Sequence, residues 1–441
     1  PHQVRNDNSS NNKLLYAKFL LIILFCLTSS PAGAANDSNE PQKSFLTELS
    51  EMVEVHGFYE MRGGYRLQND KYEKDMSIME GRFQLDLFSN LDWADVKFKG
   101  DVIGDLVTEE GDFDLREANI FTRPTDYMDV KVGRQILTWG TGDLIFINDL
   151  FPKDWESFFI GRDTEYLKAP SDAAKVSLFG DWVNLDVAFT PKFDPDRYID
   201  GRRISYWNSN LGRTAGQDAI VHTDKPDEWF RDSEIAARLY KNIDNYELAF
   251  YGYRGYWKSP GGQNAVRPEA IFPDLNVYGA SLRSAAGKGI GNAEIGYYES
   301  TDDAGGGNFL INNSEMRYLV GYTREIAKDF TMGLQYYIEQ MLDYGAYKRN
   351  LPSGPARDED RHLTSLRLTR LLMNQNLRLS LFTYYSPTDK DVYMRPSANY
   401  QVSDSMAVEL GGNVFFGDYP HTFFGQFRDN TNIYAGLRYS F

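Results

Sequence analysis

After its first fifty residues the chain alternates apolar and polar residues with period two, in segments separated by turn-forming residues. In segment 53–61, Val55, Tyr59 and Met61 fall on one face of an extended strand, and Glu60 falls on the other. The pattern therefore indicates an all-β fold. It predicts eighteen strands, with sixteen as the fallback, near residues 52–66, 75–90, 93–107, 113–123, 127–138, 172–180, 183–191, 229–240, 245–257, 275–285, 290–300, 314–325, 329–340, 361–370, 375–386, 391–402, 405–417 and 430–441.

The connections between these segments are alternately short and long. The short ones are 90–93, 124–127, 180–182, 241–245, 286–291, 327–329, 373–376 and 402–405. The long ones include 139–171, 192–228, 258–274, 301–313, 341–360 and 418–429. A soluble sandwich has no reason to sort its connections in this way, whereas an outer-membrane barrel has tight periplasmic turns and longer external loops. The sequence therefore predicts a transmembrane antiparallel up-and-down β-barrel with both termini in the periplasm.

The first thirty-five residues have the features of upstream sequence followed by a cleaved signal peptide. Lys13 and Lys18 precede an apolar stretch at 19–27, and residues 32–34 (Ala-Gly-Ala) suit a cleavage site. The stretch is too short to span a membrane as a helix, although retention as an N-terminal anchor stays open. The expected organisation is upstream residues and signal peptide at 1–35, a short periplasmic segment at 36–50 and the barrel at 51–441.

Composition argues against several other classes of protein. The 63 acidic residues outnumber the 47 basic ones, which argues against a nucleic-acid partner. The single cysteine, Cys26, lies before the cleavage site, so disulfides are not expected to hold the mature fold together. No apolar run of 18 residues follows the signal sequence, which argues against a helical membrane protein.

The alternation continues to Phe441 at the end of the sequence. Leu437, Tyr439 and Phe441 share one face, and this apolar row would meet lipid once the last strand pairs with the first. The ending resembles the C-terminal signature of outer-membrane barrels, and the resemblance implies recognition by their assembly machinery. These three residues are the expected assembly signal, and outer-membrane lipid and lipopolysaccharide are the expected surroundings.

Residues 131–167, KVGRQILTWGTGDLIFINDLFPKDWESFFIGRDTEYL, are the stretch richest in glycine, aromatic and charged side chains together. Its GRQ motif, followed by an apolar patch and G-x-G-D, resembles the porin-like and alginate-export-like families of Gram-negative outer-membrane barrels. The resemblance implies passage of small hydrophilic or anionic solutes, or of polymers, across the outer membrane.

Most of this stretch belongs to the expected third external loop, residues 139–170. The third external loop of porins often folds into the lumen and narrows it. The other interpretation is a surface loop whose aromatic residues pack on the rim of the barrel. If the loop folds inward, its charged side chains are the candidates for a constriction: Asp143, Asp149, Asp154 and Arg162.

Strand parity also identifies charged side chains that face the lumen. An arginine ladder would favour anionic solutes, and pairing of charges between neighbouring strands is the other interpretation. Arg134 would point to lipid by strict parity, so a bulge or a strand end is expected there. The inward lysines are Lys97, Lys99, Lys131 and Lys175. The other expected lumen charges are Arg238, Arg283, Arg317, Arg367, Arg378, Arg438, Glu234, Glu294, Glu339 and Glu409.

These features favour an outer-membrane channel for passive diffusion or export of small hydrophilic solutes, without enzymatic activity, cofactor or metal. An adhesin or structural barrel acting through its long loops is the alternative, and a barrel enzyme is a further one. The histidines show neither the serine spacing of a barrel hydrolase nor a metal-ligand pattern, and no particular oligomeric state is predicted. After the signal sequence these histidines are His56, His222, His362 and His421.

Overall fold

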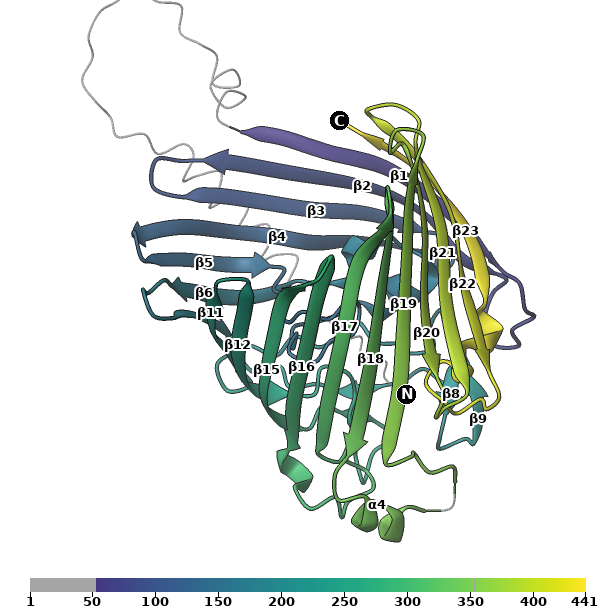
Figure 1. Ribbon diagram of the computed structural model, residues 1–441. Coiled ribbons are helices and arrows are strands. Elements are labelled where there is room, and N and C mark those ends of the chain that lie inside the picture. Colours follow the sequence, from purple (N-terminus) through teal and green to yellow (C-terminus); the bar gives the residue numbers. More distant parts are fainter. Residues whose placement is uncertain (1–52, 353) are drawn as a thin grey trace, which may run out of the picture. The chain divides into compact units, whose positions relative to one another are not determined.

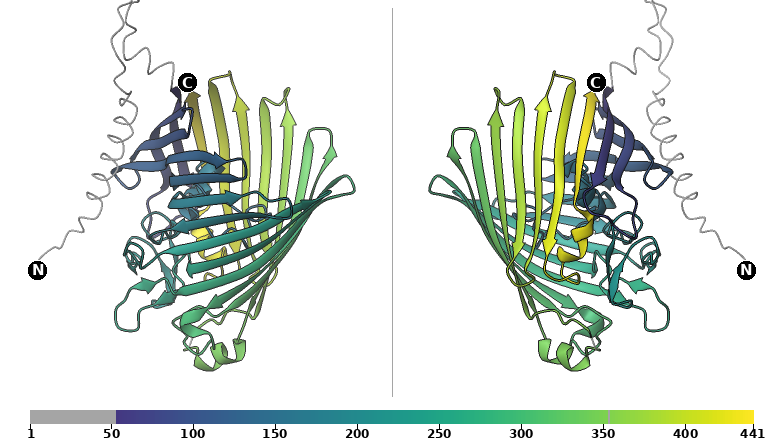
Figure 2. Two further views of the ribbon diagram at one scale, coloured as in Figure 1. Left: turned by 90° about the vertical axis from the view of Figure 1, so that its left-hand side faces the viewer. Right: turned by 90° about the vertical axis from the view of Figure 1, so that its right-hand side faces the viewer.

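The computed structural model describes residues 53–352 and 354–441, which form a closed antiparallel β-barrel (Figures 1 and 2). The expected signal peptide at 1–35 and the segment at 36–50 lie outside the described residues. The wall is one sheet of eighteen strands. These are β1 (Glu54–Arg66), β2 (Met76–Asn90), β3 (Asp95–Asp105), β4 (Glu110–Thr125), β5 (Met128–Gln135), β6 (Ser171–Leu178), β7 (Asn184–Thr190), β11 (Glu234–Ile243), β12 (Tyr246–Tyr256), β15 (Asp274–Ala286), β16 (Gly289–Ser300), β17 (Glu315–Ala327), β18 (Phe330–Met341), β19 (Asp360–Leu372), β20 (Leu377–Ser386), β21 (Asp391–Gln401), β22 (Met406–Gly417) and β23 (Asn432–Ser440).

Each wall strand pairs with the next along the chain, and β1 pairs with β23 to close the ring. The closing register runs from Phe58 opposite Ser440 to Arg66 opposite Asn432. Closure leaves neither sheet edge unpaired, as a lipid environment requires of the backbone. The prediction of eighteen strands is confirmed, and the fallback of sixteen is wrong.

The connections sort onto two rims, as the sequence predicted. Every connection of the short-turn rim is a tight turn: 91–94, 126–127, 179–183, 244–245, 287–288, 328–329, 373–376 and 402–405. The long-loop rim carries the long loops together with two short connections, 106–109 and 387–390. The long loops and the connections between wall strands contain α3 (Trp155–Ile160), α4 (Tyr344–Asn350), η1 (Thr164–Leu167), η2 (Thr301–Asp303), η3 (Gly425–Asn430), β8 (Tyr206–Asn208), β9 (Arg213–Ala215), β10 (Thr223–Asp224), β13 (Gly262–Gln263) and β14 (Ala270–Ile271).

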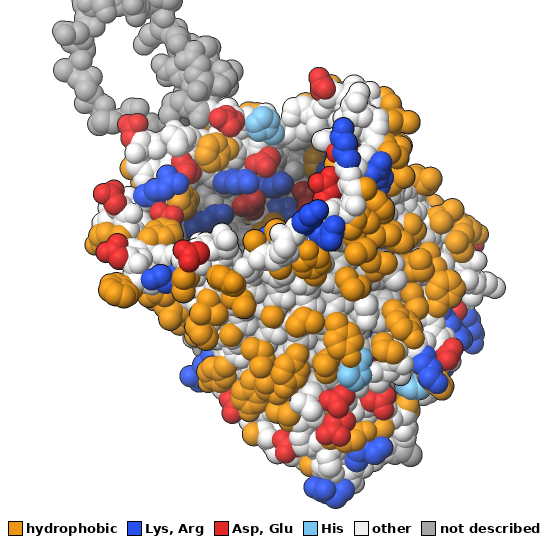
Figure 3. Space-filling view, viewed as in Figure 1, with side chains coloured by type: hydrophobic (Ala, Val, Ile, Leu, Met, Phe, Trp, Pro, Cys, Tyr) orange, Lys and Arg blue, Asp and Glu red, His pale blue; other side chains and the backbone are white. Residues whose placement is uncertain are grey.

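The outer face of the wall is apolar because period-two alternation sends every second side chain outward. Val320 is 57% exposed on the outer face of β17, whereas its neighbour Leu319 is 1% exposed on the inner face. Leu410 and Phe250 continue the outer apolar surface on β22 and β12. Figure 3 shows apolar side chains (orange) over much of the wall that faces the viewer. Such a surface suits contact with the hydrocarbon core of a membrane.

No helix in the described residues is long and apolar enough to cross a membrane.

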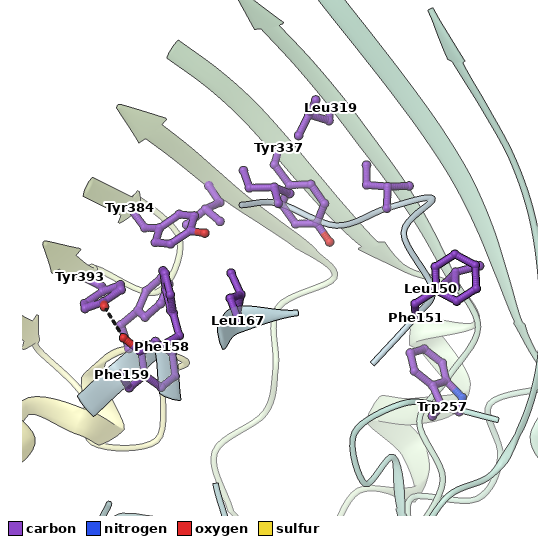
Figure 4. Close-up of a cluster of buried hydrophobic side chains, with 14 of the residues drawn as sticks. Leu150, Phe151, Phe158, Phe159, Leu167, Trp257, Leu319, Tyr337, Tyr384 and Tyr393 are labelled. Atoms are coloured by element: carbon purple, nitrogen blue, oxygen red, sulfur yellow. Dashed lines mark hydrogen bonds between the residues drawn. The ribbon is translucent and has the colours of Figure 1, made fainter. Parts of the chain in front are cut away.

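The hydrophobic core lies inside the barrel, between the wall and the connection from β5 to β6. Phe158 and Phe159 of this connection are 1% and 3% exposed, and both lie against the inward ring of Tyr393 on β21. Figure 4 shows these rings together with Tyr384 of β20, which points toward the same cluster. The core therefore fixes this connection inside the lumen.

Candidate functional site

The connection between β5 and β6, residues 136–170, is called the lumen segment below because it crosses the interior of the barrel. Trp139 lies against Tyr251 of β12, with ring centroids 6.2 Å apart. The segment then reaches β16 to β20, passes β21 and β22, and touches β1, β2 and β4 before it joins β6. Of the two interpretations of the third loop, the structure therefore shows the inward fold.

Glu294 of β16 anchors the first part of the lumen segment. Its carboxylate accepts hydrogen bonds from the Thr141 hydroxyl at 2.9 Å, from the Gly142 amide at 2.7 Å and from the Asn148 side-chain amide at 2.8 Å. The backbone amides of Thr141 and Asn148 also donate to it. A buried carboxylate with this many donors fixes the backbone around it. Glu294 was predicted to be a lumen charge, and the structure uses it as an anchor.

Asp143 lies beyond this anchor and forms a two-point ion pair with Arg367 of β19. The distances are 2.5 Å from Nε to Oδ2 and 2.8 Å from Nη2 to Oδ1. The two side chains are 41% and 33% exposed, and the Asp143 backbone also exchanges hydrogen bonds with Gln335 of β18. Asp143 is therefore the constriction candidate whose charge remains accessible from the lumen.

Asp154 begins helix α3 instead of facing a solute. Its side chain accepts a hydrogen bond from the Ser157 amide at 2.7 Å and lies 3.3 Å from Arg197. The helix ends at Gly161, whose φ of +93° is in the left-handed region. The sequence DWESFFIG thus carries an N-cap aspartate and a C-terminal glycine, a helix signal that the period-two analysis overlooked.

Asp149 and Arg162, the other two constriction candidates, also hold the lumen segment in place. Asp149 accepts from the Thr138 hydroxyl at 2.8 Å and lies 3.1 Å from Lys153, with both charged side chains 3% exposed. Arg162 donates to both carboxylate oxygens of Glu80 on β2, at 2.7 to 3.2 Å. Buried, paired charges of this kind fix geometry and have little contact with a passing solute.

The end of the segment packs on β2 and β4 through residues that the sequence analysis did not select. Tyr166 lies between the guanidinium groups of Arg82 and Arg116, which are 4.1 Å and 4.8 Å from its ring centroid. Arg82 is also paired with Asp101 at 2.6 Å. Strand parity alone would have identified Arg82 as inward-facing, but it could not reveal that these charges hold a loop.

The predicted lumen charges face inward, and most of them are paired. Arg238 pairs with Glu247 at 2.5 Å, and Arg438 lies 2.9 Å from Glu60. Arg283 and Arg378 are exposed and make no ion pair with another described residue. The remaining predicted charges pair as Arg317 with Glu315, Glu339 with Arg357, Glu234 with Lys258, and Glu409 with Arg62. Charge pairing, partly between strands and partly within a strand or with loop residues, thus describes this set better than an unpaired arginine ladder does.

A charged vestibule occupies the lumen between the lumen segment and the short-turn rim. On one side Lys97 lies 3.0 Å from Glu117, while Lys131 and Lys175 have carboxylates at 3.7 Å and 3.8 Å. On the other side, β15 to β20 contribute the arginines Arg283, Arg367 and Arg378. Figure 3 shows the hollow, with basic (blue) and acidic (red) side chains on its walls. Its surface is therefore polar and carries both signs of charge.

Arg134 points away from the lumen and is the second-last residue of β5, where a strand end or a bulge was expected. It pairs with Asp172 of β6 at 3.1 Å and donates to the Leu115 carbonyl at 2.7 Å. The strand end is the feature that occurs there, because β5 ends at Gln135. The nearby register shift of β4, between Leu115 and Glu117, lies in its pairing with β3.

One carboxyl group of the lumen segment titrates near neutral pH. Burial raises the pKa of Glu156 in α3 to about 7, although Arg162 and Arg197 act in the opposite direction. Its carboxylate lies 3.4 Å from Nε of Arg203, in the connection between β7 and β11, and burial lowers the pKa of Arg203 to about 10. The charge inside the barrel therefore changes across the neutral range.

Comparison with solved structures addresses the fold directly. OccAB3 of Acinetobacter baumannii superposes with a TM-score of 0.54 at 11% identity, covering 88% of this chain and 99% of OccAB3. OccK3 (OpdO) of Pseudomonas aeruginosa gives 0.52 at 11% identity, covering 89% and 97%. A loop-deletion mutant of OmpT, an outer membrane protein of Vibrio cholerae, gives 0.41 at 13% identity, covering 88% and 99%.

The chain has the fold of a Gram-negative outer-membrane β-barrel. No protein-family model and no curated protein sequence matches it. For an outer-membrane barrel, an apolar outer wall and a polar vestibule are the expected arrangement. The lumen segment adds an internal structure that crosses this interior.

Proposed function

We propose that this outer-membrane barrel is a porin-like channel for small solutes and that the lumen segment forms its constriction. The observation that carries the proposal is the placement of the segment across the lumen, with the Asp143–Arg367 pair facing the charged vestibule. A fixed pair of opposite charges at a narrow point acts on every ion that passes. The short-turn rim is assigned to the periplasm, because outer-membrane barrels place their tight turns there.

Planar-bilayer recording of the purified full chain tests the channel. The proposal expects discrete conductance steps, and liposome swelling is expected to follow solute size. Loss of a steric or electrostatic contact at the Asp143–Arg367 pair should alter both the conductance and the rate of liposome swelling. A barrel that is folded, as shown by heat-modifiable migration, and yet passes neither ions nor any solute at any voltage would overturn the proposal.

The matched control is a charge change outside the lumen. Asp181 lies in the short turn 179–183 and is exposed. Asp181→Asn changes the net charge by the same amount as Asp143→Asn but leaves the constriction unchanged. Equal effects of the two substitutions on ion selectivity would count against a constriction at Asp143.

A further inference from the structure

A second internal space lies on the other side of the lumen segment, toward the long-loop rim. It is a cavity of about 370 Å³ between residues 144–159 of the segment and the long-loop ends of β15 to β20. The connections at 196–199, 257–259 and 423–427 complete its walls. A solute that enters from this rim would meet the cavity before the Asp143–Arg367 pair, because Arg361 of β19 lines the cavity and Arg367 follows further along the strand.

Aromatic rings dominate the lining of the cavity. Trp155 lines it, and its ring centroid lies 6.0 Å from that of Phe146 and 6.2 Å from that of Phe159. Trp257 and Tyr298 form a second ring pair at 5.9 Å on the opposite wall. Flat rings that face a common space offer edge and face contacts to another ring.

Most of the charged groups around the cavity are paired within the protein. Lys153 pairs with Asp149, and Lys258 pairs with Glu234 at 2.6 Å. Arg317 pairs with Glu315 at 2.7 Å, and Arg361 pairs with Asp389 at 2.6 Å. Asp196 also lines the cavity and makes no ion pair with a described residue, but its carboxylate accepts hydrogen bonds from the Lys153 amide, the Trp155 ring N–H and the Ser259 hydroxyl. An anionic ligand would therefore have to leave water without gaining a free counter-charge, which is costly in a mostly apolar site.

Two buried donors at the wall make no hydrogen bond with a described residue. They are Nε1 of Trp257 and Nη2 of Arg361. Unpaired buried donors are uncommon, and an acceptor oxygen on a ligand would satisfy one of them after a small adjustment of the side chain. These two buried donors therefore adjoin a lining that is mostly apolar.

From this lining we propose that the cavity binds an uncharged, single-ring aromatic solute that carries an oxygen acceptor, a class represented by benzyl alcohol. The volume is near the lower end of the range for small-molecule sites, which favours one ring over a larger molecule. The inference rests on the proposed channel function, since it names the class of solute that the channel would receive at the long-loop rim.

Titration of the full-length barrel with benzyl alcohol, followed by tryptophan fluorescence, tests the proposal. Saturable binding is expected, and Phe146→Ala should weaken it about tenfold through loss of one ring contact. Trp257→Phe keeps a ring but removes the donor, so it should weaken binding about threefold. Trp182→Phe is the control, because Trp182 is 83% exposed in a short turn and should leave affinity unchanged.

Benzoate and glucose are the comparison ligands in the same titration. Tighter binding of either one than of benzyl alcohol, or equal affinity in wild type and in a folded Phe146→Ala variant, would overturn the assignment. Conductance recorded on the same samples separates the two proposals. If the barrel conducts but does not bind benzyl alcohol saturably, only the ligand proposal is wrong. If it binds benzyl alcohol saturably but does not conduct, the channel proposal is wrong and the binding site in the cavity stands.

Discussion

Asp143 of the lumen segment and Arg367 of β19 form a two-point ion pair across the inside of the barrel. The pair joins residues that are 224 positions apart in the sequence. It connects the segment to the far wall at the level where the charged vestibule begins, so a change at either residue should alter ion passage.

Asp143→Asn should make the channel more selective for anions. The substitution leaves Arg367 with an uncompensated positive charge, and a unit charge about 8 Å from an aqueous path changes the energy of an ion by about 0.5 kcal/mol. Because the cation is disfavoured and the anion favoured by this amount, the expected change in the cation-to-anion permeability ratio is about fivefold, measured as a shift in reversal potential under a salt gradient. Arg367→Gln should shift the ratio in the opposite direction, and a shift of the same sign for both variants would contradict the prediction.

Glu294→Ala should loosen the lumen segment. The substitution removes the acceptor for the amides of Thr141, Gly142 and Asn148, and unsatisfied buried donors of this kind cost about 2 kcal/mol or more together. Noisier and larger single-channel conductance and earlier heat modification are the expected results. Glu247→Ala is the control, because Glu247 also faces the lumen but pairs with Arg238 of the wall. Identical recordings from the two variants would show that Glu294 does not hold the segment.

Gly161→Ala should destabilise the barrel more than an alanine at another left-handed glycine. A Cβ at Gly161 would lie 2.3 Å from the ring of Tyr434, so β23 or α3 would have to move. At Gly212, with φ of +62°, a Cβ meets nothing within 4 Å, and the expected cost is only the backbone strain of about 1 kcal/mol. Thermal unfolding in detergent measures both variants, and equal stability losses would show that the Gly161 contact is unimportant.

Deletion of Phe441 should reduce the amount of folded barrel in the outer membrane. Its backbone pairs with Gly57 through hydrogen bonds of 3.0 Å and 3.1 Å, and its ring lies 5.6 Å from that of Tyr59. The deletion therefore removes both the last link of the closing seam and the last ring of the proposed assembly signal. Heat-modifiable protein in outer-membrane fractions gives the measurement, with Phe441→Trp as the variant expected to accumulate normally. Normal accumulation of the deletion variant would rule out an assembly role.

The contribution of Glu156 to stability should fall as pH rises from about 4.5 to about 7. The folded-state pKa of Glu156 is raised from 4.5 to about 7 by burial, so in this range the folded state binds more protons than the unfolded state. Burial also raises the pKa of Glu73, in the connection between β1 and β2, to about 7, so Glu73 changes stability with pH in the same direction. Unfolding measured at pH 4.5, 6 and 8 should become less pH-dependent in Glu156→Gln. If the pH dependence of unfolding is unchanged in that variant, Glu156 does not cause it.

The strand pattern could be predicted because each wall strand carries its own signal. Alternation at Leu410 and Glu409, for instance, is visible within a few residues, and lipid outside with water inside imposes it on every wall strand. The turn lengths are equally local. The helix α3 was missed because the analysis followed period two through a segment whose cap residues, Asp154 and Gly161, indicate a helix.

Sequence alone determined the wall of this protein: eighteen strands, their inner and outer faces, and the grouping of the long loops on one rim. Only the tertiary structure decided what fills the lumen. Asp149 and Asp154 hold a loop and have little contact with a passing solute, because Asp149 pairs with Lys153 and Asp154 pairs with Arg197. These pairs depend on where the loop lies inside the barrel. Inward parity gives a side chain its direction, whereas its partner is set by the packing of residues far apart in the chain. The anchor at Glu294 and the pair between Asp143 and Arg367 are contacts of this second kind.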